Sequence, residues 1–291
     1  MIAALIAAFT MGVAACGGDD KGGGGGKIEG GTLTIYSSLP EQGASGGQTK
    51  AMENGATLAV ETKGGKVGKY TVKYKPLDDS LASTGAADEG KARQNARTAV
   101  SDKTTAGYIG EYNSGISKVT IPILNRAGIA QISPANTYVG LTTNKPGSEP
   151  GEPDKYYPTG KRTYARVVPA DTIQGAALAQ ASQQAGCKSI HIWNSKTTYS
   201  TGLARNVTMA AEKIGLEVQG NDGIDPKAPN YRSLAENVKA DCFILTGEIE
   251  SNGVQAVKDV ASANPNAKLF AGDGMCLGDT ADPKKGLPAD I

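Results

Sequence analysis

A turn and the helix after it carry the first group of side chains suited to binding a ligand. Residues 106–109 are predicted to form a strand that ends in the turn 110–113, and a helix begins near Ser114, a residue type that caps helix amides. The unpaired amides and the dipole at such a helix start attract anions. We therefore expect Asn113 and Ser114 to bind a polar, partly anionic molecule.

A second loop follows the neighbouring predicted strand, residues 129–133. Pro134 ends that strand and leaves Ala135, Asn136 and Thr137 on a loop at its carboxyl end. Open α/β sheets bind ligands at this edge, so we expect the two loops to share one small solute. Ordinary loop and cap hydrogen bonding accounts for the same residues equally well, and spacing alone does not separate the two interpretations.

Residues 43–47 match the pattern G-x-S-x-G of a nucleophile elbow, which would indicate a hydrolytic enzyme if a suitable base were present. The single histidine, His191, lies in the middle of a predicted strand, residues 189–193, whereas a triad base belongs on a loop at the active edge. His191 is therefore interpreted as structural. No phosphate-binding loop or dinucleotide fingerprint appears in a strand-to-helix context, so we expect no cofactor and no catalysis.

Composition excludes further classes of protein. The 291 residues include 30 Lys and Arg against 29 Asp and Glu, which gives no electrostatic reason to expect a nucleic acid partner. The four cysteines, Cys16, Cys187, Cys242 and Cys276, include no C-x-x-C pair, so no metal site is expected. With 39% hydrophobic and 20% charged residues, the chain can form two domains with buried cores.

The N-terminal residues 1–16 are predicted to be an export leader. They are apolar and small, and they end in Val-Ala-Ala-Cys, which resembles a bacterial lipobox with Cys16 as the lipidated residue. A plain signal peptide and a buried N-terminal helix are the alternatives. Residues 17–30 are rich in glycine and would form a flexible tether with a reach of roughly 20 Å.

From residue 32 onward the sequence alternates between predicted strands and predicted helices. The strands are expected at 32–38, 70–76, 106–109, 129–133, 163–168, 189–193, 216–219, 242–246 and 269–271. The helices are expected near 52–63, 86–100, from Ser114, and at 173–185, 202–214, 231–238 and 254–263, with a surface excursion at 141–162. Repeated βα units predict an α/β fold of two doubly wound parallel-sheet lobes with a hinge, lobe 1 at 31–168 and lobe 2 at 169–291.

Five segments resemble the branched-chain amino-acid-type (leucine-binding-like) substrate-binding proteins of ABC transporters, which have the type I periplasmic binding protein fold. They are residues 110–114, 132–137, 164–171, 196–202 and 270–274. The resemblance implies an exported protein that captures a small polar solute, such as an amino acid of the branched-chain type, and delivers it to an ABC permease. It also implies a monomer that lies outside the cytoplasm, at the membrane through the lipid at Cys16.

The resemblance also assigns roles to single residues. Asp273 would meet the ligand's ammonium group, where the family usually has Glu. Tyr199, expected on a loop, would cover the ligand from lobe 2, and Glu248 would line the cleft where the family often has an aromatic residue. Because Asp273 and Glu248 differ from the residues usual in the family, the resemblance does not identify the side chain of the ligand.

Three further expectations come from the same resemblance. Cys187 and Cys242 would begin neighbouring strands and form a disulfide, as an exported protein can; three free thiols are the alternative. The chain would end before lobe 2 is complete, so that it is C-terminally truncated. A ligand-sensing receptor domain, or a binder of amides or urea on the same fold, remains as an alternative function.

Overall fold

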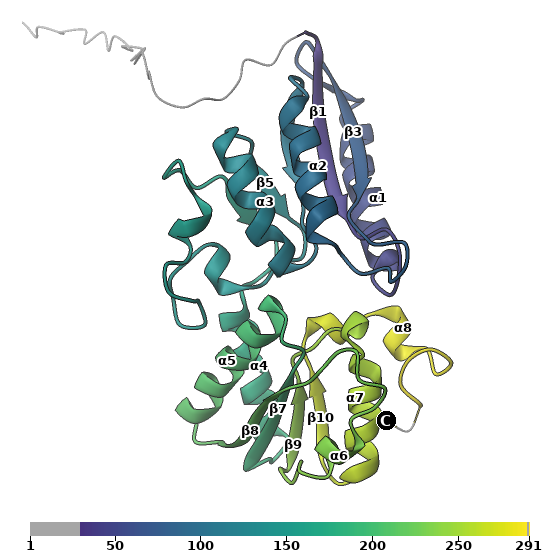
Figure 1. The fold of residues 1–291 in the computed structure, drawn as a ribbon, viewed down its shortest axis with the longest axis vertical. Helices are drawn as coiled ribbons and strands as arrows, with labels where there is room; N and C mark the ends of the chain where they lie inside the picture. The colour runs from purple at the N-terminus through teal and green to yellow at the C-terminus, as the bar shows by residue number, and fades with distance from the viewer. Residues whose placement is uncertain (1–29, 290) are drawn as a thin grey trace, which may run out of the picture.

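The computed structural model describes residues 30–289 and residue 291. The predicted leader with Cys16, and nearly all of the predicted tether, lie outside the described residues. Within the described residues, no helix is both long and apolar enough to span a bilayer. The chain folds into two α/β lobes, seen one above the other in Figure 1, which confirms the predicted fold class.

The first lobe is organised around a sheet with the strand order β2-β3-β1-β4-β5-β6. Its strands are β1 (Thr32–Leu39), β2 (Lys66–Val67), β3 (Tyr70–Asp78), β4 (Thr105–Ile109), β5 (Gln131–Ser133) and β6 (Tyr164–Arg166). All neighbours are parallel except β2, which pairs antiparallel with β3 at the edge. Strand β2 was not predicted from the sequence; Gly64, Gly65 and Gly68 adopt the left-handed backbone that its tight connections need.

The second lobe contains a parallel sheet with the strand order β10-β9-β7-β8. Its strands are β7 (Ser189–Asn194), β8 (Glu217–Gly223), β9 (Cys242–Leu245) and β10 (Lys268–Ala271). Alternate residues of β7 pack on opposite faces: Ile190 and Ile192 join the core that includes Leu203, while Trp193 joins the core that includes Val260. Helices cover both faces, as the buried hydrophobic strands require.

The helices of the first lobe are α1 (Gly46–Thr62), α2 (Glu89–Ser101) and α3 (Ser114–Arg126). Those of the second are α4 (Asp171–Gln184), α5 (Thr198–Lys213), α6 (Arg232–Ala235), α7 (Gly253–Ala263) and α8 (Gly278–Ala281). Single 3-10 turns are η1 (Val139–Leu141), η2 (Asp154–Tyr156), η3 (Ile249–Ser251) and η4 (Asp273–Met275).

Several predicted boundaries were wrong. Helix α5 begins at Thr198 rather than near Gly202, because the Thr197 side chain accepts the Ser200 amide and caps it. Helix α2 begins at Glu89, after the capping residue Asp88. Residues 231–238 form only the short helix α6, and β8 continues to Gly223.

The excursion at 141–162 was predicted to lie on the surface, but it is anchored by a buried carboxylate. Glu152 is 4% exposed and accepts hydrogen bonds from the hydroxyls of Tyr138 (2.7 Å) and Tyr156 (2.5 Å). Burial opposes its ionisation, but these hydroxyls, the Glu149 amide and Lys118 lower the pKa of Glu152 to about 2. The segment is therefore fixed to the first lobe.

The side chains of Cys187 and Cys242 form a disulfide, with their Cα atoms 5.9 Å apart. Cys242 is the first residue of β9, and Cys187 lies two residues before β7, the strand beside it. His191 is 5% exposed in the middle of β7, and its Nε2 lies 2.7 Å from Asp222 Oδ2. It therefore has a partner within the second lobe and lies away from the residues of the site.

Candidate functional site

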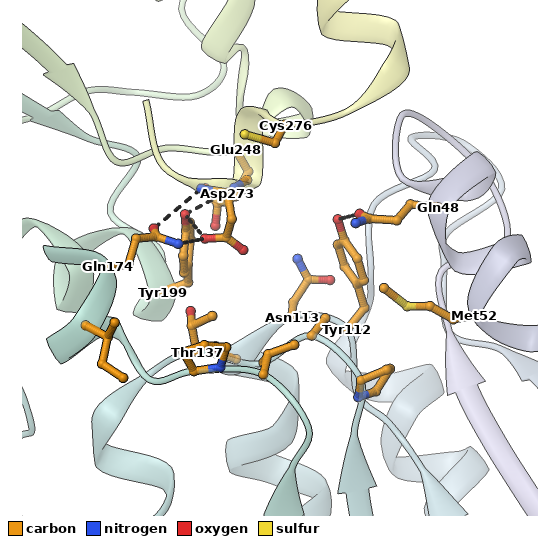
Figure 2. A pocket seen from close by; sticks show the side chains of 17 residues that line it. Gln48, Met52, Tyr112, Asn113, Thr137, Gln174, Tyr199, Glu248, Asp273 and Cys276 are labelled. Carbon is orange, nitrogen blue, oxygen red and sulfur yellow. Dashed lines mark hydrogen bonds between the residues drawn. The ribbon is translucent and has the colours of Figure 1, made fainter. Parts of the chain in front are cut away.

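A cavity of about 430 Å³ lies between the two lobes, within the range of small-molecule sites. It is lined by Gln48, Met52, Tyr112, Asn113, Ser114, Pro134, Ala135, Thr137, Val168, Pro169, Ile173, Gln174, Tyr199, Glu248, Asp273, Gly274 and Cys276. Figure 2 shows Asn113 and Thr137 on the side of the first lobe, facing Tyr199 and Asp273 of the second.

The start of α3 forms part of the first lobe's contribution. Helix α3 begins at Ser114, as predicted, but the N-cap position is Asn113, whose side chain makes no capping bond, so Ser114 does not cap the helix. The Ser114 hydroxyl instead accepts the Tyr138 amide at 3.4 Å. Because the first amides of a helix lack intrahelical partners, this end of α3 can receive an anionic group of a ligand.

The loop after β5 is held by Ser133 as well as by the sheet. The Ser133 hydroxyl accepts hydrogen bonds from the backbone amides of Ala135 (3.2 Å) and Asn136 (2.8 Å), so these amides already have a partner within the loop. Asn136 is buried, donates to the Tyr112 carbonyl at 2.7 Å, and is not among the lining residues. Of this loop, Ala135 and Thr137 reach the cavity.

Asp273 lies at the start of η4 in the second lobe, across the cavity from Ser114 and Thr137. Its Oδ1 accepts hydrogen bonds from the Tyr199 hydroxyl (2.7 Å) and from Gln174 Nε2 (2.8 Å), drawn as dashed lines in Figure 2. Tyr199 lies on the first turn of α5, not on a loop as predicted. Burial, and then the charge of Asp273, raise the pKa of the Tyr199 phenol well above its ordinary value, so this hydroxyl stays a donor.

Glu248 is the second acidic group of the lining. It is 6% exposed, and its two oxygens accept the hydroxyls of Ser195 (2.5 Å) and Thr197 (2.6 Å). Burial raises the pKa of Glu248 to about 7, although those hydroxyls lower it in part. A ligand that brings positive charge or donors to this carboxyl would favour its ionised form.

A third acidic residue, Glu250 on η3, connects the lobes. Its Oε1 accepts the Ser45 hydroxyl at 3.0 Å and faces Asn113 Nδ2 at 3.5 Å, and both partners belong to the first lobe. Glu250 was not predicted as a site residue, because it stands two residues from Glu248 without a motif of its own. Gln48, whose Oε1 accepts a hydrogen bond from the Tyr112 hydroxyl at 2.7 Å, was not predicted either.

Seven of the eight residues proposed to bind the ligand therefore line the cavity. The exception is Asn136, which is buried and is not a lining residue. The helix residues Met52 and Gln174 and the loop residue Cys276 also line the cavity, although no sequence motif marked them. The lining contains no lysine, arginine or histidine. No group of three or more potential metal ligands was found in the described part of the chain.

Comparison with known proteins gives a family and a set of similar folds. A family profile described as "Periplasmic binding protein" matches residues 32–289. A solute binding protein of an ABC transporter from Rhodopseudomonas palustris, in complex with p-hydroxybenzoic acid, has a TM-score of 0.70 at 14% identity, over 84% of this chain and 62% of that one.

Two further solved structures have the same fold. A leucine binding protein from Thermotoga maritima has a TM-score of 0.67 at 22% identity, over 83% of this chain and 63% of that one. A second Rhodopseudomonas palustris solute binding protein, in complex with benzoate, has a TM-score of 0.68 at 21% identity, with coverages of 86% and 65%. The chain therefore spans less than two thirds of the length of these structures. The search of curated protein sequences gave no match.

Proposed function

Because the chain belongs to the periplasmic binding protein family, we propose that it is an extracytoplasmic solute-binding protein that captures an amino acid and delivers it to an ABC permease. The observation that carries the proposal is the cavity between the lobes, with an acid on one side and hydroxyls and a helix start on the other. A ligand with an ammonium group and a carboxylate group satisfies both sides.

The ligand's carboxylate would lie at the start of α3, within reach of Ser114 and Thr137. Its ammonium would lie at Asp273, whose position is fixed by Tyr199 and Gln174. Hydrogen bonds between charged groups are the stronger ones, so these two contacts would orient the solute. The resemblance implies a branched-chain amino acid, and Met52, Pro134 and Ile173 supply apolar lining for the aliphatic part of a side chain.

The proposal extends to the location and the partners of the protein. Export and lipid attachment at Cys16 are proposed from the leader-like residues 1–16. The disulfide between Cys187 and Cys242 supports an oxidising compartment outside the cytoplasm. The partners would be the solute, the membrane through its lipid anchor, and a permease, with the protein acting as a monomer and performing no chemistry on the solute.

An aromatic acid is a second candidate ligand, because four of the similar structures are named with benzoate or a hydroxylated benzoic acid. Such a ligand has no ammonium group for Asp273, and the lining offers no cation for its carboxylate. An uncompensated carboxylate near Asp273 and Glu248 would be repelled. The charges of the cavity therefore favour the amino acid.

The test is a thermal-shift and calorimetric screen of the purified protein against amino acids, amides, urea and benzoate. A ligand at a hundred times its dissociation constant stabilises the folded state by about 2.7 kcal/mol. We expect an amino acid to bind and Asp273→Ala to weaken it at least tenfold, while the exposed control Asp154→Ala binds normally. Binding of amides or benzoate alone would overturn the amino acid and the role of Asp273.

A further inference from the structure

Three acidic side chains at the cleft have no cationic partner among the described residues. Glu248, Glu250 and Asp273 take part in none of the ion pairs found within residues 30–289. Two buried acceptor atoms, Glu250 Oε2 and Asn113 Oδ1, have no hydrogen-bond partner in the part of the chain that the structure describes. A buried acceptor without a donor is costly, which indicates that the missing donors come from the solute.

Thr137 gives an independent indication of a ligand at the same place. Its side chain is 6% exposed, and its hydroxyl lies close enough to the buried Asp171 carboxyl to lower the pKa of that carboxyl, but it makes no hydrogen bond of good geometry among the described residues. Figure 2 shows this side chain directed across the cavity toward Tyr199 and Asp273. A polar group buried without a partner is uncommon in a folded protein. A solute between the lobes would satisfy it.

The position of Glu248 decides which part of the solute it meets. A Cβ on Gly274 would lie 3.1 Å from Glu248 Cγ and 3.2 Å from Tyr199 Cε1, so Gly274 separates the two only by its backbone. Because Gly274 directly follows Asp273 in the sequence, Glu248 lies in space next to the proposed ammonium site at Asp273. A solute held there by its ammonium group places its side chain beside Glu248.

The charges around this position have one sign. Tyr112 lines the cavity, and after burial the charges of Glu250, Asp273 and Glu248 all raise the pKa of its phenol. Glu250 likewise acts to raise the pKa of Glu248. A zwitterionic solute pairs its ammonium with Asp273 and leaves Glu248 and Glu250 without a cation, with only neutral groups as their hydrogen-bond donors. An apolar side chain would bury both without supplying a donor.

Resting on the proposed function, we infer that the amino acid taken by this protein has a side chain ending in a hydrogen-bond-donating nitrogen, an amide or a cation, and that Glu248 selects it. Glu248 would accept a hydrogen bond from that nitrogen, and Glu250 would contribute a second acceptor. Sites built to bind a polar group reject analogues that lack it more strongly than apolar pockets reject added polar groups. Leucine would therefore be disfavoured relative to asparagine, which has nearly the same shape.

The experiment measures dissociation constants by calorimetry for leucine, asparagine, glutamine, glutamate and lysine. The proteins are the wild type, Glu248→Gln, Glu248→Leu and the exposed control Glu217→Gln, each checked for an unchanged melting temperature or circular dichroism spectrum. We expect the wild type and the control to bind asparagine, glutamine or lysine at least tenfold more tightly than leucine. Glutamate, which replaces the amide of glutamine by a carboxylate, should bind at least tenfold more weakly than glutamine.

The variants separate this inference from the proposed function. The quantity to compare is the affinity for asparagine divided by the affinity for leucine. Glu248→Leu should lower this ratio at least tenfold. Glu248→Gln, which keeps an acceptor oxygen, should lower it less. Equal or tighter binding of leucine by the wild type, with a ratio that Glu248→Leu leaves unchanged, would overturn the inference while the amino acid function stands. Failure of every amino acid to bind to the folded wild type would overturn both.

Discussion

Asp171 is the most completely buried acid near the cavity without a hydrogen-bond partner. Its side chain is fully buried at the start of α4, and neither carboxyl oxygen makes a hydrogen bond of good geometry among the described residues, although the Thr137 hydroxyl lies near. Burial raises the pKa of Asp171 from 3.8 to about 7; the Thr137 hydroxyl and Arg166 act in the opposite direction, and the charge of Asp273 adds to the rise. The native protein therefore holds this carboxyl largely protonated at pH values where an unfolded chain would ionise it.

The sign of the resulting pH dependence follows from proton linkage. Between about pH 4 and pH 7 the native state binds the proton of Asp171 and the unfolded state releases it, so Asp171 makes stability fall as pH rises. Asp171→Asn should remove a contribution on the order of 3 kcal/mol across this window. Urea unfolding at several pH values would show a flatter dependence in the variant. Parallel curves for the two proteins would contradict the prediction, since Glu248 shifts in the same direction in both.

At the scale of the element, the disulfide joins the loop that precedes β7 to the first residue of β9. The two cysteines are separated by 55 positions in the sequence, and this closed segment contains α5, β8 and α6. In the chain-entropy account, closing a loop of this length stabilises the native state by roughly 4 kcal/mol, because the unfolded chain loses conformations. The second lobe should therefore depend on it.

The prediction is that the double variant Cys187→Ala with Cys242→Ala loses roughly 3 to 4 kcal/mol of unfolding free energy. Equilibrium urea denaturation measures this, followed by intrinsic fluorescence of Trp193, which lies in the second lobe. Cys276→Ala is the matched control, because its exposed thiol is free, and it should unfold as the wild type does. A wild type that unfolds identically with and without reductant would contradict the prediction.

At the scale of the whole molecule, Glu250 is placed to favour the closed arrangement of the lobes. It contacts Ser45 and Asn113 across the cleft, and the Arg205 guanidinium of the second lobe pairs with Glu149 of the first. Such contacts exist only while the lobes are close together. Hydrogen bonds of this kind contribute about 0.5 to 1.5 kcal/mol each.

Removing the contacts that Glu250 makes with Ser45 and Asn113 should therefore shift the population toward molecules with separated lobes. We expect Glu250→Ala without ligand to show a larger radius of gyration by small-angle scattering, and to bind its solute about 3- to 10-fold more weakly because fewer molecules are competent. Glu236→Ala, an exposed glutamate of the second lobe, is the control. An unchanged radius of gyration would show that Glu250 does not hold the lobes together.

The sequence by itself determined the α/β class, the two lobes and most of the elements, because hydrophobic periodicity and capping are properties of neighbouring residues. It also identified the strand ends that face the cavity, since the carboxyl edge of a parallel sheet follows from topology. Tyr199 and Asp273 were proposed as site residues from the resemblance of their motifs to a family. They lie 74 positions apart in the sequence, and only the fold brings the Tyr199 hydroxyl to 2.7 Å from Asp273 Oδ1.

Only the tertiary structure decided which of those residues line the cavity and what charge surrounds them. Asn136 belongs to a predicted loop, yet its side chain is used inside the first lobe by Tyr112 and Tyr164. Glu250 has no local signature, because its partners Ser45 and Asn113 stand 205 and 137 positions away. Burial and the absence of nearby cations result from packing between distant segments, and a linear pattern does not contain them.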